Sequence, residues 1–238
     1  PVTLRELYKS FFDYDLFPIY IIRFLIEMSS GPVSSYLQLS LRQLGLSTFK
    51  TNALTIPSSV LSLVTMFAFS YLSDIIDSRS LHFAFNAIWC ISTLIPMRYW
   101  SGSGKQEHAW GTFALLTVLL GHPPLTALST SWCSANSNSV KTRAVSAAVV
   151  NMFSQADSIV AANIYRQDDA PLYHRGNTQL IGIAFGGFRV AVLSRFYYQF
   201  RNKQREKKWQ SLSELEKLEY TTTTTDEGNK RLDFRFIY

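Results

Sequence analysis

Residues 54–72 read LTIPSSVLSLVTMFAFSYL and contain no charged side chain. A helix needs about 20 mostly apolar residues to cross the hydrocarbon core of a bilayer, and this run comes close to that length. Five other windows have the same character, and the complete set is residues 16–41, 54–72, 82–100, 110–132, 144–165 and 179–200. The pattern predicts an all-α membrane protein with six transmembrane helices.

The overall composition is consistent with this prediction. Only 17% of the 238 residues are charged, against about 25% in a typical soluble domain. Because the charges gather near the two ends of the chain, we expect residues 14–200 to form the transmembrane unit, with charged segments at 1–13 and 201–238 outside it. A soluble all-α protein with buried helices is the alternative, and six apolar runs of this length disfavour it.

The basic residues predict how the chain is oriented. A net charge of +6 would suit a nucleic-acid partner. The basic residues, however, stand at the ends of the apolar windows and in the run RNKQREKK at 201–208, which is typical of membrane topology rather than of a nucleic-acid groove. An even number of spans places both ends of the chain on the same side of the membrane. That side carries more of the Lys and Arg residues. We therefore expect a multi-pass integral membrane protein in contact with the lipid bilayer, with cytoplasmic termini and no nucleic acid.

Aromatic residues mark the ends of several windows. Trp100, Trp110, Trp132 and Tyr165 stand there, as in the aromatic belt of a membrane protein. For Trp132 a stacking wall inside the protein is the alternative, and the belt is favoured. The two cysteines, Cys90 and Cys133, lie inside apolar runs, which indicates buried thiols rather than a disulfide framework.

The sequence contains no phosphate-binding loop, no zinc-ligand spacing and no nucleophile elbow. We therefore expect no enzymatic activity, no cofactor and no metal. The polar stretch NIYRQDDAPLYHRGNTQ at 163–179 is expected to form a short, structured extracellular loop. A metal site built there from Asp168, Asp169 and His174 is a minor alternative.

Longer stretches of the chain resemble a known family. They are YLQLSLRQLGLSTFKTNALTIPS at 36–58, SANSNSVKTRAVSAAVVNMFSQADSIVAANIYRQDDAPLYHRGNT at 134–178, and, in the tail, RNKQREKKW at 201–209 and GNKRLDFRFIY at 228–238. These stretches resemble the C-terminal half of fungal major facilitator superfamily transporters. Within that superfamily the chain is similar to the anion:cation symporter family, and there to the allantoate permease-like group, which includes nicotinate, pantothenate and biotin carriers.

The resemblance implies that the six spans form the C-terminal half of a major facilitator superfamily fold, and that the N-terminal six-helix half is missing from this chain. It further implies that residues 1–13 are a cytoplasmic linker and residues 201–238 a cytoplasmic tail. It also implies a plasma-membrane carrier of a small organic anion, a carboxylate of the vitamin or ureide type. Transport would be coupled to protons, as a symport by alternating access. The alternative is a truncated or non-transporting membrane protein that acts as a regulator or interaction partner.

Breaks in two spans point to the substrate cavity. Carriers of this kind contain inverted repeats of three helices, and corresponding helices interrupted by glycine or proline mark the substrate site. SSGPVSS at 29–35 and LLGHPPLTA at 119–127 occupy corresponding positions. The alternatives are ordinary kinks and, for the two amides on the fifth span, links between helices. The predicted cavity residues are Gly31, Pro32, Ser34, Gln38, His122, Pro124, Ser129, Asn151 and Gln155.

Charged residues inside the apolar windows are costly and are therefore candidate functional residues. Arg23 and Glu27 are one helical turn apart and share a helix face, which suggests ion coupling, with mutual neutralisation as the alternative. In the turn YLSDIIDSRS at 71–80, Asp74 and Arg79 resemble the acidic and basic loop motif of the superfamily. They form a candidate gating loop, and a solvated turn is the alternative.

Overall fold

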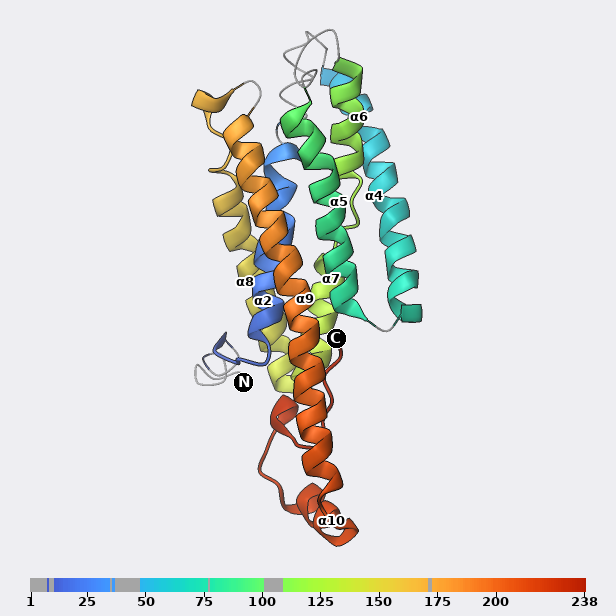
Figure 1. Ribbon diagram of the computed structural model, residues 1–238, viewed down its shortest axis with the longest axis vertical. Helices are drawn as coiled ribbons and strands as arrows, with labels where there is room; N and C mark the ends of the chain where they lie inside the picture. The colour runs from blue at the N-terminus through green and yellow to red at the C-terminus, as the bar shows by residue number, and fades with distance from the viewer. Residues whose placement is uncertain are drawn as a thin grey trace.

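The computed structural model describes residues 8, 11–34, 36, 48–76, 78–100, 109–170 and 173–238. Within these ranges every regular element is a helix and no strand is present. The helices run side by side in an elongated bundle, and the last long helix reaches well beyond it (Figure 1). The predicted all-α architecture is therefore confirmed for the described residues.

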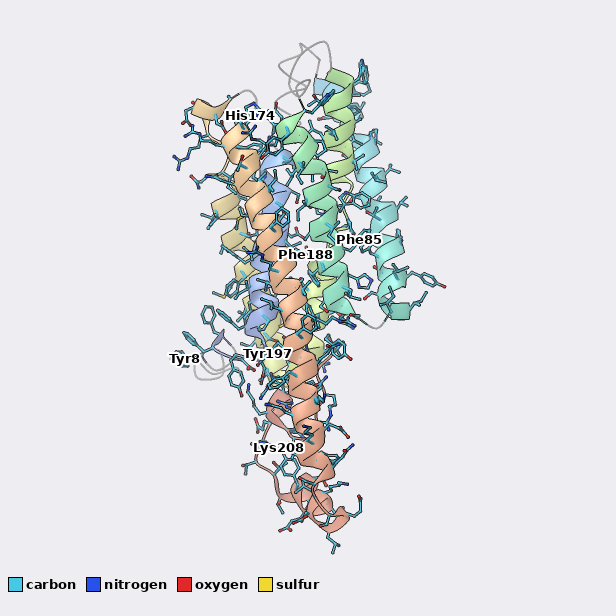
Figure 2. All side chains as sticks on the ribbon, viewed as in Figure 1. Tyr8, Phe85, His174, Phe188, Tyr197 and Lys208 are labelled. Atoms are coloured by element: carbon cyan, nitrogen blue, oxygen red, sulfur yellow. The ribbon has the colours of Figure 1, made fainter. Side chains whose placement is uncertain are left out.

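Long helices joined by short connections build the bundle. They are α2 (Phe17–Ile26) with the 3-10 turn η1 (Glu27–Ser29), α4 (Thr48–Ile76), α5 (Arg79–Tyr99), α6 (Ala109–Leu120), α7 (Thr126–Ser137), α8 (Val140–Ala161) and α9 (His174–Gln210). The smaller elements are η3 (Gln167–Asp169), α10 (Glu214–Thr223) and η4 (Gly228–Lys230). Along α9, His174 lies at one end of the bundle and Tyr197 near the other, with Lys208 beyond it (Figure 2). We call these the loop end and the tail end of the bundle.

Within the part of the chain that the structure describes, four segments are long and apolar enough to cross a membrane, namely Asn52–Ser73, Arg79–Tyr99, Thr142–Ala161 and His174–Gln210. Window 110–132 holds two shorter helices, α6 and α7, because Gly121, Pro123 and Pro124 interrupt the helical hydrogen bonds between them. In window 16–41 the helical turns continue to Ser34, and of the residues that follow only Tyr36 is described. Six transmembrane spans therefore remain a prediction.

The outer surface of α4 is apolar. Val64, Phe67 and Tyr71 are each more than half exposed, whereas Ser58 and Thr65 of the same helix are buried. In water such a continuous apolar surface would favour association. In a bilayer it contacts lipid, and the polar face turns toward the protein. The distribution agrees with a helix that lies in a membrane.

Helix α2 lies in the centre of the bundle and packs against α7, α8 and α9, while α5 packs along α9. Trp132 of α7 belongs to this core: its indole is completely buried and lies 5.4 Å from the Phe83 ring and 5.9 Å from the Tyr198 ring. The belt interpretation of Trp132 is therefore wrong, because α7 turns the indole inward. Trp110, by contrast, is 77% exposed.

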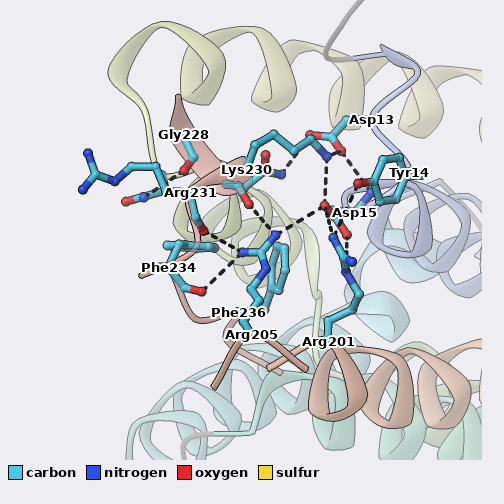
Figure 3. Close-up of polar contacts among 12 residues, drawn as sticks. Asp13, Tyr14, Asp15, Arg201, Arg205, Gly228, Lys230, Arg231, Phe234 and Phe236 are labelled. Atoms are coloured by element: carbon cyan, nitrogen blue, oxygen red, sulfur yellow. Dashed lines mark hydrogen bonds and ion pairs between the residues drawn. The ribbon is translucent and has the colours of Figure 1, made fainter. Parts of the chain in front are cut away.

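A cluster of charged residues lies at the tail end of the bundle (Figure 3). Asp15, just before α2, is completely buried. Its carboxylate accepts hydrogen bonds from Tyr197 Oη at 2.7 Å, Arg201 Nε at 3.1 Å and Lys230 Nζ at 2.8 Å. Burial raises the pKa of Asp15, but the hydrogen bonds from Lys230, Tyr197 and Arg201 outweigh it and hold that pKa below its ordinary value. This cluster ties the start of α2 to α9 and to the end of the chain.

We expect Asp15→Asn to destabilise the fold, because Arg201 loses its carboxylate partner and Lys230 is left with Asp13 alone. Breaking a buried ion pair costs about 3–5 kcal/mol. Since the pKa of Asp15 is depressed in the folded state, its contribution is present above the ordinary carboxyl pKa and is lost as pH falls through the folded-state value. Thermal unfolding of the purified protein in detergent, at neutral pH and on acidification, measures both effects.

The matched control is Asp168→Asn, because Asp168 also pairs with an arginine but on the surface. The side chains of Asp168 and Arg175 are 61% and 67% exposed, and exposed pairs contribute little to stability. The unfolding temperature should stay the same. Equal effects of the two replacements would show that the Asp15 cluster does not stabilise the fold.

Candidate functional site

A cavity of about 1150 Å³ lies between α2 with η1, α4, α8 and the connection that follows α6. Each of these elements contributes polar side chains to its wall. They include Arg23, Glu27, Ser34, Ser58, Ser59, Ser62, His122, Ser154, Asp157 and Ser158. The cavity is therefore polar although the helices around it are apolar on the outside.

The break between α6 and α7 shapes one wall of the cavity. Prolines 123 and 124 donate no backbone hydrogen bond, so carbonyls near them need other partners. Thr65 Oγ1 of α4 donates to Gly121 O at 2.8 Å, and Ser62 Oγ donates to His122 O at 3.3 Å. A Cβ on Gly121 would lie 2.3 Å from Leu61 Cδ2. Glycine at this position therefore allows α4 to pack directly on the break.

The imidazole of His122 is held from behind by α5. Asn86 is completely buried. Its Nδ2 donates to Pro123 O at 3.0 Å and lies 3.2 Å from His122 Nδ1. Asn86 thus fixes both the broken backbone and the ring that lines the cavity.

Arg23 of α2 is a buried cation in the cavity wall, only 3% exposed. Its Nη2 donates to Ser154 Oγ at 2.5 Å, and its Nη1 lies 3.5 Å from both Glu27 Oε1 and Asp157 Oδ2. Within the described residues, Arg23 Nε and Nη1 and Asp157 Oδ2 have no hydrogen-bond partner. Buried polar atoms are rarely left in this state, so the group has capacity for a ligand.

The charges of this group do not balance. Two carboxylates, Glu27 and Asp157, stand beside one guanidinium. With both acids ionised the group carries one net negative charge, which is costly away from water. A proton or another cation would neutralise it.

Three tyrosines line the loop end of the cavity. The rings of Tyr165 and Tyr173 stack with their centroids 4.6 Å apart, and Tyr36 meets Tyr173 edge-on at 4.9 Å. Tyr173 has a φ of 46°, a left-handed conformation that is uncommon for a bulky residue. A Cβ on Gly176 would lie 2.5 Å from Tyr165 Cδ1, so glycine makes room for this stack.

The structure brings together part of the predicted set. Gly31, Pro32, Ser34 and His122 line the cavity with Arg23 and Glu27, whereas Pro124, Ser129, Asn151 and Gln155 are not among the described lining residues. Ser129 is completely buried and bonds to Thr126 O, because α7 after the break turns this face into the core. Asn151 and Gln155 are exposed on α8. Gln38 lies outside the described residues.

The predicted gating pair cannot be compared directly, because the side chain of Asp74 lies outside the described part. Arg79 Nη1 donates to Ser131 Oγ at 2.7 Å, and Arg79 N donates to Tyr238 O at 2.9 Å. Arg79 therefore contacts α7 and the tail of the chain. Its pairing with Asp74 remains a prediction.

In the loop at 163–179, the residues weighed as metal ligands contact other groups. Asp168 pairs with Arg175, Asp169 Oδ2 accepts from Gly176 N at 2.9 Å, and His174 Nδ1 lies 3.0 Å from Arg98 Nη1. Across the described residues, no three His, Cys, Asp or Glu side chains are grouped so that they could hold a metal. Ion pairs and hydrogen bonds within the protein therefore engage Asp168, Asp169 and His174.

Two groups of cavity residues were not predicted from the sequence as site residues. Asp157 and Ser154 meet Arg23 from α8, and a lone acid in an apolar window was the available signal. Along α4, Thr55, Ser58, Ser62 and their neighbours line the cavity. Their spacing of three and four residues marks one helix face.

Comparison with known proteins identifies relatives in yeast. No family model and no solved structure match the chain. It is 40% identical over 214 residues to a Saccharomyces cerevisiae protein named as an uncharacterized transporter, YOL162W, and the match covers 90% of this chain and 99% of that protein. It is 37% identical over 238 residues to the S. cerevisiae uncharacterized transporter YIL166C, covering 100% of this chain and 43% of that protein.

A more distant relative has a named substrate. The chain is 24% identical over 218 residues to the high-affinity nicotinic acid transporter of S. cerevisiae, and the match covers 90% of this chain and 39% of that protein. The chain thus spans less than half the length of YIL166C and of the nicotinic acid transporter, and nearly the full length of YOL162W.

We expect a cysteine at Ser59 to react readily with a small water-soluble thiol reagent, because Ser59 is exposed in the cavity wall. A cysteine at Ser129, which is completely buried, should react far more slowly. The native Cys90 and Cys133 are buried, so the unmodified chain serves as the blank. Fast labelling at Ser129 with none at Ser59 would contradict the described cavity.

Proposed function

Since the chain belongs to the transporter family of its yeast relative YOL162W, we propose that it takes part in the transmembrane transport of a small organic anion. The observation that carries the proposal is the buried Arg23, which lines the cavity and has donors without a hydrogen-bond partner. A guanidinium binds carboxylates through charge-assisted hydrogen bonds. The cavity volume of about 1150 Å³ leaves room for a molecule of vitamin or ureide size.

Proton coupling follows from competition for Arg23. The Asp157 carboxylate stands 3.5 Å from Arg23 Nη1, where it competes with an anionic substrate. A proton on Asp157 removes this competitor and also cancels the net negative charge of the group. Proton and anion therefore favour each other's binding, which is the thermodynamic requirement for symport. Glu27 lies at the same distance from Nη1 and takes part in the balance.

The carrier is proposed to need a second six-helix half. In alternating access, two halves rock around a site at their interface, and this chain would supply the C-terminal half of a major facilitator superfamily fold. Its length relative to YIL166C and the nicotinic acid transporter fits this arrangement. Polar cavity walls such as that of α4 would otherwise face lipid, which is costly.

The proposed substrates are carboxylates of the kind carried by the nicotinic acid transporter, with pantothenate, biotin and allantoate as further candidates. The proposed location is the plasma membrane, with the tail end of the bundle in the cytoplasm. A non-transporting regulator is less well supported, because the relatives are named as transporters.

Uptake of labelled nicotinate, pantothenate, biotin and allantoate, in cells that lack their own carriers, tests the function. We expect proton-dependent uptake when residues 1–238 are coexpressed with the N-terminal half of YIL166C, and none when they are expressed alone. Saturable uptake by residues 1–238 alone would contradict the need for a second kind of half. No uptake of any anion in either arrangement would count against the transport proposal.

Arg23→Gln should lower this uptake about tenfold or more, because a hydrogen bond to a charged group contributes about 1.5–3 kcal/mol. Asp157→Asn resembles the protonated acid, so uptake should persist but lose its dependence on the proton gradient. Arg175→Gln is the matched control, since Arg175 is exposed in the loop after α8. Undiminished uptake in Arg23→Gln would exclude Arg23 as the anion site.

Cysteine labelling in intact cells tests the orientation. Arg166 and Lys203 are both exposed and lie toward opposite ends of the bundle. A cysteine at Arg166 should react with a membrane-impermeant reagent from outside, and a cysteine at Lys203 only after permeabilisation. The reverse pattern would invert the proposed topology.

A further inference from the structure

The last residues of the chain return to the bundle. After α9 the chain passes through α10 and then runs back, so that residues 228–238 lie against the tail end (Figure 1). We call residues 228–238 the tail segment. It contacts α7, α9 and the start of α5, and it meets the residues just before α2 (Figure 3).

Two asparagines bind the backbone of the tail segment. On α9, Asn202 Nδ2 donates to Phe236 O at 2.8 Å, and Phe236 N donates to Asn202 Oδ1 at 2.8 Å. On α7, Asn136 makes the same pair with Ile237, at 3.0 and 2.9 Å. Trp132 Nε1 also donates to Ile237 O at 2.8 Å. Two consecutive residues are thus each paired through both N–H and C=O, Phe236 with α9 and Ile237 with α7.

Aromatic contacts hold the side chains of the tail segment. Phe236 is 3% exposed and lies 5.2 Å from the Tyr198 ring. The guanidinium of Arg205 stands 4.5 Å from the centre of the Phe236 ring, and that of Arg195 stands 5.3 Å from the Tyr238 ring. Arginine over an aromatic face is an attractive arrangement. The bundle therefore binds both the backbone and an aromatic side chain of the tail segment.

The start of the tail segment is also recognised. Arg205 donates to Asn229 O at 2.8 Å and to Phe234 O at 3.3 Å. Lys230 Nζ reaches Asp13 Oδ1 at 2.6 Å and Asp15 Oδ2 at 2.8 Å. Gly228 has a φ of +60°, and a Cβ there would lie 2.8 Å from Ser137 O. Glycine at this position is required by both the backbone angle and the space.

We propose that Trp132, Asn136, Asn202 and Arg205 form a peptide-binding socket, and that the tail segment is its releasable occupant. The contacts are those of peptide recognition: backbone pairing, one anchoring aromatic ring and charged contacts at the rim. The chain between α9 and the tail segment is mostly exposed, so it acts as a tether that keeps the segment near the socket. Docked, the segment is a latch between α7, α9 and the residues before α2.

The latch is a property of the tail end and does not depend on the proposed transport. It is tested by cutting the tether in the full chain. A site-specific protease sequence is inserted between Thr224 and Thr225, the purified protein is cleaved in detergent, and gel filtration with mass spectrometry follows the released peptide. We expect the peptide to stay with the bundle. Its loss from the otherwise unmodified protein would overturn the socket.

Variants in the same cleavable chain identify the contacts. Asn202→Ala and Phe236→Ala should each weaken retention about tenfold or more, whereas Lys203→Ala, exposed beside Asn202, should not. Unfolding temperatures before cleavage check that each variant is folded. Equal retention in all three variants would overturn the assignment of the socket.

Release is tested by competition. An excess of a synthetic peptide with the sequence GNKRLDFRFIY should displace the cleaved segment, and a scrambled peptide of equal composition should not. Failure of the matching peptide to displace it would show a permanent part of the fold rather than a latch. Equal displacement by both peptides would exclude sequence-specific recognition.

Discussion

A helix that breaks among apolar neighbours must find partners for the backbone groups it frees, because an apolar environment offers no water to bind them. Between α6 and α7 this constraint is met by side chains of neighbouring helices. Thr65 and Ser62 of α4 bind the carbonyls of Gly121 and His122, and Asn86 of α5 binds that of Pro123. The same hydrogen bonds hold α4 against the break. Since α4 and the break are two walls of the cavity, the cavity depends on how the break is satisfied.

Two buried charged residues of the bundle, Asp15 and Arg23, differ in how fully their polar atoms are hydrogen-bonded. Asp15 at the tail end is completely buried and accepts hydrogen bonds from Tyr197, Arg201 and Lys230, a saturated arrangement that serves the fold. Arg23 in the cavity is equally buried, yet two of its nitrogens lack hydrogen-bond partners among the described residues. Unsatisfied buried charge is unfavourable for stability. Its presence in a polar cavity is the reason to look for a ligand there rather than at Asp15.

The sequence predicted the helices better than the directions of their side chains. Apolar length decides whether a segment can cross a membrane, and this property is visible in the windows. The orientations of Ser129 and Trp132 depend on how α7 is rotated after the break, and no apolar window encodes that rotation. Gly31, Pro32 and His122 were predictable because helix breaks have a sequence signature. The contact of Asp157 with Arg23 was not, because it joins distant helices.

The docking of the tail segment had no sequence signature either. Asparagine side chains that pair with a backbone form no periodic pattern, and the partners are about a hundred residues apart in one case. Helix α2 nevertheless lies between the tail segment and the cavity. Asp15, which binds Lys230, stands at the start of this helix, and Arg23 follows about 12 Å along it. A helix transmits a tilt at one end to its whole length. Undocking removes Lys230 from Asp15 and leaves Arg201 and Arg205 of α9 as its ion-pair partners. The docked tail segment therefore adds a restraint at the start of the helix that carries Arg23.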